Sequence, residues 1–406
     1  MADSETPNKR PIKIVCVVGA RPNFMKIAPI MRAFAERPAD FAPLLVHTGQ
    51  HYDVAMNERF FHQLRIPNPD MSLEVGSGSH AVQTAEVMKR FEPVLDEHLP
   101  DAVLVVGDVN STIACALVAS KKGVKVVHVE AGLRSFDLQQ PFPEEANRRL
   151  VDVFADYLFA PTDGAADNLR KEGYKDSAIF VTGNTGIDAL LLATDIVRKQ
   201  GHALPMNLPA GSKLALLTAH RRESFGDGLV RICQAVLRLL DQHPILHVLY
   251  PVHPNPNVQE AAQKYLASHP RIYLCAPLEY PGFVSVLAAA DLILTDSGGV
   301  QEEAPALGKR VLVLRETTER PEGIDAGVAE LVGTDVDKIV TRATALLQGN
   351  APKDRVLSPY GDGRASERIV EVLKTGALHS AFHLDTQDTA QDRPLQRVSQ
   401  TRQLSR

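Results

Sequence analysis

The chain has 406 residues, which is too many for one ordinary hydrophobic core and typical of two or three domains. Hydrophobic residues make up 44% and charged residues 23%, the balance of a globular enzyme and not of a disordered chain. The formal net charge of −5 argues against a general basic surface for nucleic acid or anionic membranes.

The four cysteines indicate a reducing compartment. Cys16, Cys115, Cys233 and Cys275 lie far apart and show neither CxxC nor Cys/His ligand spacing, so we expect buried thiols and no metal site. Residues 1–11 are polar and lack the apolar run of a secretory signal. No stretch approaches the roughly 18 apolar residues that span a bilayer. We therefore expect a cytoplasmic protein that binds neither nucleic acid nor membrane.

Short runs of β-branched and other apolar residues alternate with amphipathic segments of helix length along the chain. Near-continuous apolar runs are typical of parallel strands covered by helices on both faces. The alternation predicts a doubly wound α/β architecture. The predicted strands are 12–18, 43–47, 102–106, 124–129, 157–160 and 179–182 in the first half, and 213–218, 247–251, 272–275, 292–295 and 311–314 in the second.

Gly and Pro interrupt both periodicities at residues 201–211, directly after a predicted helix over 187–199. We therefore predict an N-terminal Rossmann-like domain over 12–200 and a C-terminal Rossmann-like domain over 201–362.

Further helices are predicted over 335–347 and, after the turn Pro-Tyr-Gly-Asp-Gly, over 364–374. Beyond them, residues 377–406 are rich in Gln, Ser, Thr, Asp and Arg and contain few apolar side chains. Such a composition does not bury enough apolar surface to order a chain. We expect disorder there and in residues 1–11.

In an open parallel sheet, ligands bind beyond the carboxyl ends of the strands. The first strand is followed by Arg21 and, in the opening helix, Lys26. A guanidinium and an ammonium group beside a helix N-terminus form an anion site. The alternative is ordinary surface charge on the loop.

Three carboxylates follow the later strands of the first half. Asp108 comes directly before a helix, where it would also serve as an N-cap. Glu130 ends a buried strand, a costly place for a charge that is neither paired nor used. Glu144 opens a helix, where acidic residues are common. Brought together with Arg21 and Lys26, these carboxylates would form a site for proton abstraction and return.

The second half carries two histidines after successive strands. His220 is followed by Arg221 and Arg222, a run that favours phosphate neutralisation over a purely structural histidine. His253 has the same kind of position one strand later.

A Ser-Gly-Gly turn at Ser297, Gly298 and Gly299 joins a strand to a helix. Glycines there let backbone N–H groups approach an anion, and Glu303, one turn further, can bind ribose hydroxyls. Since the turn is neither GxGxxG nor a Walker A motif, it favours a nucleotide diphosphate sugar over NAD or ATP. The alternative is a turn without a ligand. Arg320 lies in a segment that would complete the pocket.

Taken together, the motifs resemble those of the non-hydrolysing UDP-N-acetylglucosamine 2-epimerases. The resemblance holds in order and spacing from about residue 12 to 374. The matching segments are GARPNFMKIAP, GDVNST, HVEAGLRS, PFPEEANR, TGNTGIDAL, TAHRRESFG, YPVHPNP, LTDSGGVQEEAP, TTERPEG and PYGDG.

The resemblance implies a GT-B-like architecture, with two Rossmann-like domains facing a cleft and a final helix, residues 363–376, crossing back onto the first domain. It further implies a homodimer, a UDP-sugar substrate and no cofactor. Ser297, Gly298 and Gly299 would hold the diphosphate, Glu303 the ribose and Phe283 the uracil. The catalytic positions would be Asp108, Glu130, Glu144 and His220, and the other substrate-binding positions Arg21, Lys26, Arg148, His253 and Arg320.

The family's mechanism would be elimination of UDP across C1–C2, through 2-acetamidoglucal, followed by re-addition. The sequence departs from the allosteric pattern of some bacterial members: Gln50 and His51 match it, but Asp53 replaces a glutamine and the loop 75–80 lacks an arginine. We therefore expect little sigmoidality in substrate.

Four alternatives remain. Residues 47–53 look like a subgroup that includes epimerases of 2,3-diacetamido-glucuronate sugars. A GT-B glycosyltransferase would share the two domains but would not need the carboxylate cluster, and it would require an acceptor. A hydrolysing epimerase would release free N-acetylmannosamine, and a nucleotide-sugar sensor would have no use for the carboxylates.

Overall fold

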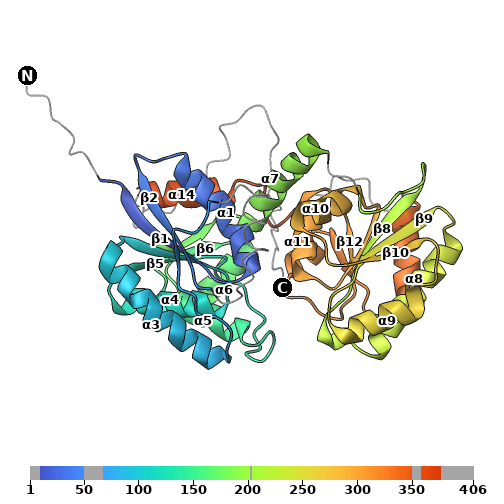
Figure 1. Cartoon of the computed structure of the whole chain (residues 1–406), viewed down its shortest axis with the longest axis horizontal. Coiled ribbons are helices and arrows are strands. Elements are labelled where there is room, and N and C mark those ends of the chain that lie inside the picture. Colours follow the sequence, from blue (N-terminus) through green and yellow to red (C-terminus); the bar gives the residue numbers. More distant parts are fainter. Residues whose placement is uncertain (1–9, 50–66, 202–203, 350–357, 376–406) are drawn as a thin grey trace, which may run out of the picture.

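The computed structural model describes residues 10–49, 67–201, 204–349 and 358–375. Two α/β halves lie side by side, and the long helix α7 (Thr185–Gln200) runs between them (Figure 1). Within the described residues, the first half holds a parallel sheet of seven strands in the order β3-β2-β1-β4-β5-β6-β7. Its strands are β1 (Ile12–Val18), β2 (Phe41–His47), β3 (Met71–Ser72), β4 (Ala102–Val106), β5 (Lys125–Val129), β6 (Tyr157–Ala160) and β7 (Ile179–Val181).

Helices cover both faces of this sheet because side chains alternate along each strand. From β1, Ile14 and Cys16 pack into one buried cluster with α1 and α7, whereas Val15 and Val17 pack into another with α3 and α4. The helices of this half, besides α7, are α1 (Arg21–Ala35), α3 (His80–His98), α4 (Asn110–Lys121), α5 (Glu144–Phe154) and α6 (Asp163–Lys171).

The described part of the second half holds a six-stranded parallel sheet in the order β10-β9-β8-β11-β12-β13. Residues of β8 alternate in the same way, with Leu214 and Leu216 facing α10 and α11, and Leu217 facing α8 and α13. The strands are β8 (Lys213–Thr218), β9 (Leu246–Pro251), β10 (Ile272–Cys275), β11 (Leu292–Thr295), β12 (Val311–Val313) and β13 (Ala329–Leu331). The helices are α8 (Asp227–Gln242), α9 (Pro256–Leu266), α10 (Tyr280–Ala289), α11 (Gly298–Ala306), α12 (Pro321–Asp325) and α13 (Val336–Leu347).

The last described helix, α14 (Ala365–Thr375), packs on the first half (Figure 1). Ile369 and Leu373 join the buried cluster that contains Phe34 of α1. The N-terminus of α14 is held by Asp188 of α7, whose carboxylate accepts from the N–H groups of Ala365 and Ser366 at 3.1 and 2.7 Å. This helix therefore completes the core of the first half from the far end of the chain.

The predicted α/β fold is confirmed, and each predicted strand is present with ends within two residues of the prediction. Sequence reading missed β3 and β13. Both are edge strands of two or three residues, too short to show a period, and β13 carries Glu330 at its centre. No described helix is long and apolar enough to cross a membrane. The predicted disorder in residues 377–406 lies outside the described residues.

Candidate active site at the carboxyl ends of the two sheets

The strand order reverses between β1 and β4 in the first sheet, and between β8 and β11 in the second. Ligands of doubly wound sheets bind at the carboxyl ends of the strands beside such a reversal. Asp108 follows β4, His220 follows β8 and Ser297 follows β11, so the predicted residues lie where the topology places a site.

Glu130 is the first residue after β5, and its side chain is only 8% exposed. Its φ of 72° is the left-handed conformation that non-glycine residues rarely adopt, and its N–H donates to the carbonyl of Phe159 at 3.0 Å. The carboxylate forms an ion pair with the ammonium group of Lys26. The structure thus brings together two of the predicted residues from β5 and α1.

Lys26 remains a cation in this setting. Burial alone would lower the pKa of Lys26, but the carboxylates of Glu130, Glu302 and Asp108 outweigh it and raise that pKa. Because Glu302 belongs to α11, the field at Lys26 comes from both halves of the molecule. The two sheet edges therefore share one electrostatic environment.

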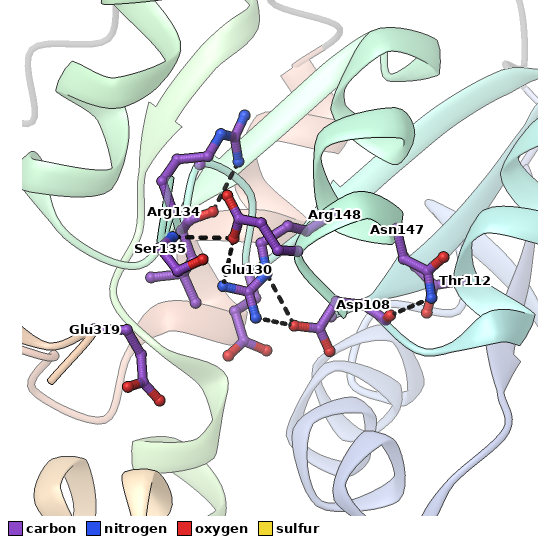
Figure 2. A network of polar contacts seen from close by, with 12 residues as sticks. Asp108, Thr112, Glu130, Arg134, Ser135, Asn147, Arg148 and Glu319 are labelled. Carbon is purple, nitrogen blue, oxygen red and sulfur yellow. Dashed lines mark hydrogen bonds and ion pairs between the residues drawn. The ribbon is translucent and has the colours of Figure 1, made fainter. Parts of the chain in front are cut away.

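Asp108 is paired separately, with Arg148 of α5 (Figure 2). Nε of Arg148 lies 3.1 Å from Oδ2 of Asp108, and the neighbouring Asn147 donates to the Asp108 carbonyl at 2.9 Å. Arg148 also lies 3.4 Å from the fully buried carboxylate of Glu145. The pairing leaves the Asp108 side chain 26% exposed, so a ligand can reach it.

For two other predicted residues of the first half, no contact with this group is described. Glu144 opens α5 and is half-buried, and its side chain makes no hydrogen bond or ion pair with the described residues. Arg21 begins α1, but the position of its side chain is not described.

His220 is held at the end of β8 by Asp296, which is fully buried. Asp296 accepts from the N–H groups of His220 and Arg221 at 2.6 and 2.7 Å, and its second oxygen lies 3.3 Å from Nδ1 of His220. The imidazole stacks on His253, with ring centroids 5.2 Å apart. Burial lowers the pKa of His220, and the charges of His253 and Arg221 lower it further. Together these effects outweigh the charge of Asp296, which acts in the opposite direction. A neutral, partly exposed imidazole therefore faces the site.

The Ser-Gly-Gly turn forms the N-terminus of α11, with Ser297 as the N-cap residue. The N–H of Ser297 donates to Oγ1 of Thr295, whereas Gly298 and Gly299 lie in the first turn, where N–H groups have no intrahelical partner. A Cβ atom on Gly298 would lie 2.5 Å from Nη1 of Arg320. A side chain at this position would therefore displace the Arg320 guanidinium, which lies against the helix start.

Glu303, one turn into α11, accepts from the Tyr280 hydroxyl at 3.2 Å. Burial, reinforced by the charge of Glu302, raises the pKa of Glu303 to about 8, despite the hydrogen bond from Tyr280 and the charge of Lys26. Phe283 of α10 is half-buried against the hydrophobic cluster that contains Tyr280.

Sequence reading missed two carboxylates, Glu302 and Asp296. Glu302 accepts from Nε of Arg320 at 2.6 Å and from the Asn184 amide, which belongs to the first half, at 2.7 Å. Both lie in the LTDSGGVQEEAP segment, so a signal was present. Successive helix residues point about 100° apart, so choosing Glu303 as the ligand left the direction of Glu302 unspecified.

Comparison with known proteins shows the family to which the chain belongs. Residues 32–374 match the family model described as UDP-N-acetylglucosamine 2-epimerase. The chain belongs to this family. It is similar to the UDP-N-acetylglucosamine 2-epimerase of Escherichia coli K12, with 43% identity over 377 residues, covering 90% of this chain and all of that one.

Solved structures of 2-epimerases agree in fold. That of the Neisseria meningitidis enzyme bound to UDP-GlcNAc has a TM-score of 0.82 at 38% identity, covering 90% of this chain and all of that one. That of the Methanocaldococcus jannaschii enzyme with UDP-GlcNAc and UDP has a TM-score of 0.75 at 37% identity and the same coverage. These matches confirm the predicted resemblance, the GT-B-like fold and the assignment to an isomerase.

Proposed function

We propose that this 2-epimerase interconverts UDP-N-acetylglucosamine and UDP-N-acetylmannosamine by elimination and re-addition of UDP. The C2 proton has no neighbouring carbonyl and is not acidic, so its removal is coupled to loss of the anomeric leaving group. One carboxylate takes the C2 proton, the C1–O bond breaks, and 2-acetamidoglucal and UDP form. Re-addition of UDP, with a proton delivered to the other face, inverts C2.

The observation that carries this proposal is the pair of carboxylates Asp108 and Glu130, each held by its own cation. An ion pair with Arg148 or Lys26 holds each carboxylate in one orientation, and proton transfer requires a positioned group. A glycosyltransferase would need no such pair. In this proposal Glu144 completes the acid–base set.

The second half would bind the nucleotide. The free N–H groups of Gly298 and Gly299, with Ser297 and Arg320 beside them, would hold the diphosphate, Glu303 the ribose and Phe283 the uracil. His220, supported by His253, would gain a proton as the diphosphate departs, because an adjacent anion favours the imidazolium. Arg21 would add positive charge from the other half.

We further propose that the enzyme acts in the cytoplasm as a homodimer, without a cofactor, and that the two Rossmann-like domains span 12–200 and 201–362. Related UDP-sugars with other C3 and C6 substituents, such as 2,3-diacetamido-glucuronates, are the alternative substrates that residues 47–53 suggest.

Proton NMR of UDP-N-acetylglucosamine with enzyme in D2O, without an acceptor, tests the reaction. Deuterium should appear at C2 as UDP-N-acetylmannosamine accumulates, because the exchanging carboxylates equilibrate with solvent. Deuterium-free product would exclude the mechanism, and absence of product would favour a transferase or the diacetamido substrate. Free N-acetylmannosamine as the product would indicate a hydrolysing enzyme.

Glu130→Gln keeps the shape of the side chain but removes its basicity, and should lower kcat by about 100-fold or more. UDP affinity should change little, since its main proposed contacts lie in the second half. Glu86→Gln, on the surface of α3, is the matched control and should retain wild-type turnover. Equal activity of the Glu130→Gln variant and this control would remove Glu130 from the mechanism.

A further inference from the structure

Beneath the two carboxylates lies a buried pair that the proposed reaction does not use, His128 of β5 and Asp152 of α5. Both side chains are fully buried. Nδ1 of His128 lies 2.6 Å from Oδ1 of Asp152, and Nε2 lies 2.9 Å from the carbonyl oxygen of Gly107. A neutral imidazole has one donor and one acceptor nitrogen, whereas this ring faces an acceptor on each side.

The partners fix the hydrogen positions on the ring. A backbone carbonyl only accepts, so Nε2 must donate to Gly107. Asp152 already receives the guanidinium of Arg134 at 2.7 Å and the N–H of Gly132 at 3.3 Å on its other oxygen, which holds it as a carboxylate acceptor. Nδ1 faces the remaining oxygen of this carboxylate. His128 therefore lies between two acceptors, one at each ring nitrogen.

Each contact of this pair ends next to a proposed acid–base residue. Gly107 immediately precedes Asp108, and its own N–H donates to the Val129 carbonyl at 3.0 Å, so β5 holds Gly107 from both sides. Asp152 binds the side chain of His128 and the backbone of Gly132, two residues before and two residues after Glu130. It thus brackets the left-handed turn in which Glu130 lies.

We infer that His128 and Asp152 are a positioning pair that sets the relative placement of Asp108 and Glu130, the two carboxylates of the function proposed above. The geometry is that of one buried ion pair reaching both backbone segments at once. Buried ion pairs add little net stability compared with apolar packing, so a strictly structural role explains this arrangement poorly. A fixed separation of two proton-transfer groups on opposite faces of a sugar explains it directly, because a misplacement of about 1 Å can cost about 100-fold in rate.

Two substitutions of His128 separate its two bonds. The amide of His128→Asn replaces Nδ1 and can still reach Asp152, but it leaves the Gly107 carbonyl unbound. The longer amide of His128→Gln replaces Nε2 and can still reach Gly107, but it leaves Asp152 unbound. Asp152→Asn removes the charge from the bracket around Glu130. The matched control is His247→Asn, a buried strand histidine of the second sheet.

The decisive measurement is a ratio, because a ratio does not depend on how much of a variant is folded. The reaction is run in D2O and stopped early. The ratio divides the amount of deuterium at C2 of the recovered UDP-N-acetylglucosamine by the amount of UDP-N-acetylmannosamine formed. If the pair sets the placement of the two carboxylates, the His128 and Asp152 variants should change this ratio at least threefold and lower kcat by about 10–100-fold. UDP affinity and the His247→Asn ratio should match wild type. A wild-type ratio in all three variants would overturn the inference, whatever their kcat.

A second measurement needs no activity. Proton–nitrogen NMR of the full-length enzyme labelled with 15N-histidine should show hydrogen-bonded ring N–H signals, protected from exchange with water, from one histidine, and these should be missing in His128→Asn. Absence of such protected ring signals in the wild-type enzyme would overturn the inference. If instead wild-type enzyme makes no epimer while these signals are present, the proposed reaction fails and the buried arrangement stands.

Discussion

Replacing Gly298 by alanine tests the geometry of the nucleotide end of the site. The added Cβ would lie 2.5 Å from Nη1 and 2.7 Å from Cζ of Arg320, whereas ordinary contacts begin at 3.4 Å. The guanidinium must therefore retreat by about 1 Å. That shift stretches its 2.6 Å bond to Glu302 to or beyond the hydrogen-bond limit and leaves a buried carboxylate poorly paired.

Breaking a buried ion pair outright costs about 3–5 kcal/mol. Arg320 also contacts Glu319, so part of its pairing survives the substitution. We therefore expect a loss of about 2–4 kcal/mol in the free energy of unfolding. In a protein of this size that corresponds to a melting temperature lower by about 2–5 °C.

Gly299→Ala is the matched control for thermal unfolding. The Cβ added there meets only Ser297 Oγ, at 4.0 Å, and alanine favours helix over glycine by about 1 kcal/mol. Its melting temperature should therefore equal or slightly exceed that of wild type. Circular dichroism melts of the two variants decide the matter. If both melt together, Arg320 does not lie against Gly298 and the packing argument for this glycine is wrong.

Two further predictions concern pH. Glu303, with its pKa raised to about 8, is protonated near pH 7 in the free enzyme, so if ribose binds its carboxylate, UDP affinity should rise between pH 6 and 8. Calorimetry should show that Glu303→Ala weakens UDP binding by about 1–3 kcal/mol. The affinity of the Glu303→Gln variant for UDP should lack this part of the pH dependence. An unchanged UDP affinity in both variants would remove Glu303 from the site. Burial alone would raise the pKa of Glu319, but the charges of Arg320 and Arg315 lower that pKa to about 2. The stability that ionised Glu319 gives the fold is therefore complete above the ordinary pKa of 4.5 and is lost as pH falls toward 2. Melts of Glu319→Gln should lack that acid-dependent loss, and a curve parallel to wild type would show that the ion pairs do not stabilise the fold.

The sequence predicted the architecture because parallel strands covered on both faces leave a continuous apolar signal. It also located the site, since topology alone brings the residues after β4, β5, β8 and β11 to two facing edges. What it did not predict was the pairing. Which cation neutralises which carboxylate depends on side-chain direction: Arg148 binds Asp108 and Lys26 binds Glu130, although chain order suggests neither choice. Glu302 shows the same limit, because its partners Asn184 and Arg320 lie 118 and 18 residues away in the chain.

The position of α14 sets a schedule for biosynthesis. The apolar side of α1, including Phe34, is covered by Ile369 and Leu373 of α14, a helix that the ribosome makes late. At about 5–20 residues per second, this covering arrives roughly 10 to 35 seconds after residue 200 has been added. During that interval the nascent first half carries an uncovered hydrophobic strip, which a chaperone would have to shield. Any gene truncated before Ala365 would make that exposure permanent, so an isolated first half would need α14 joined to it by a linker to remain free of aggregation.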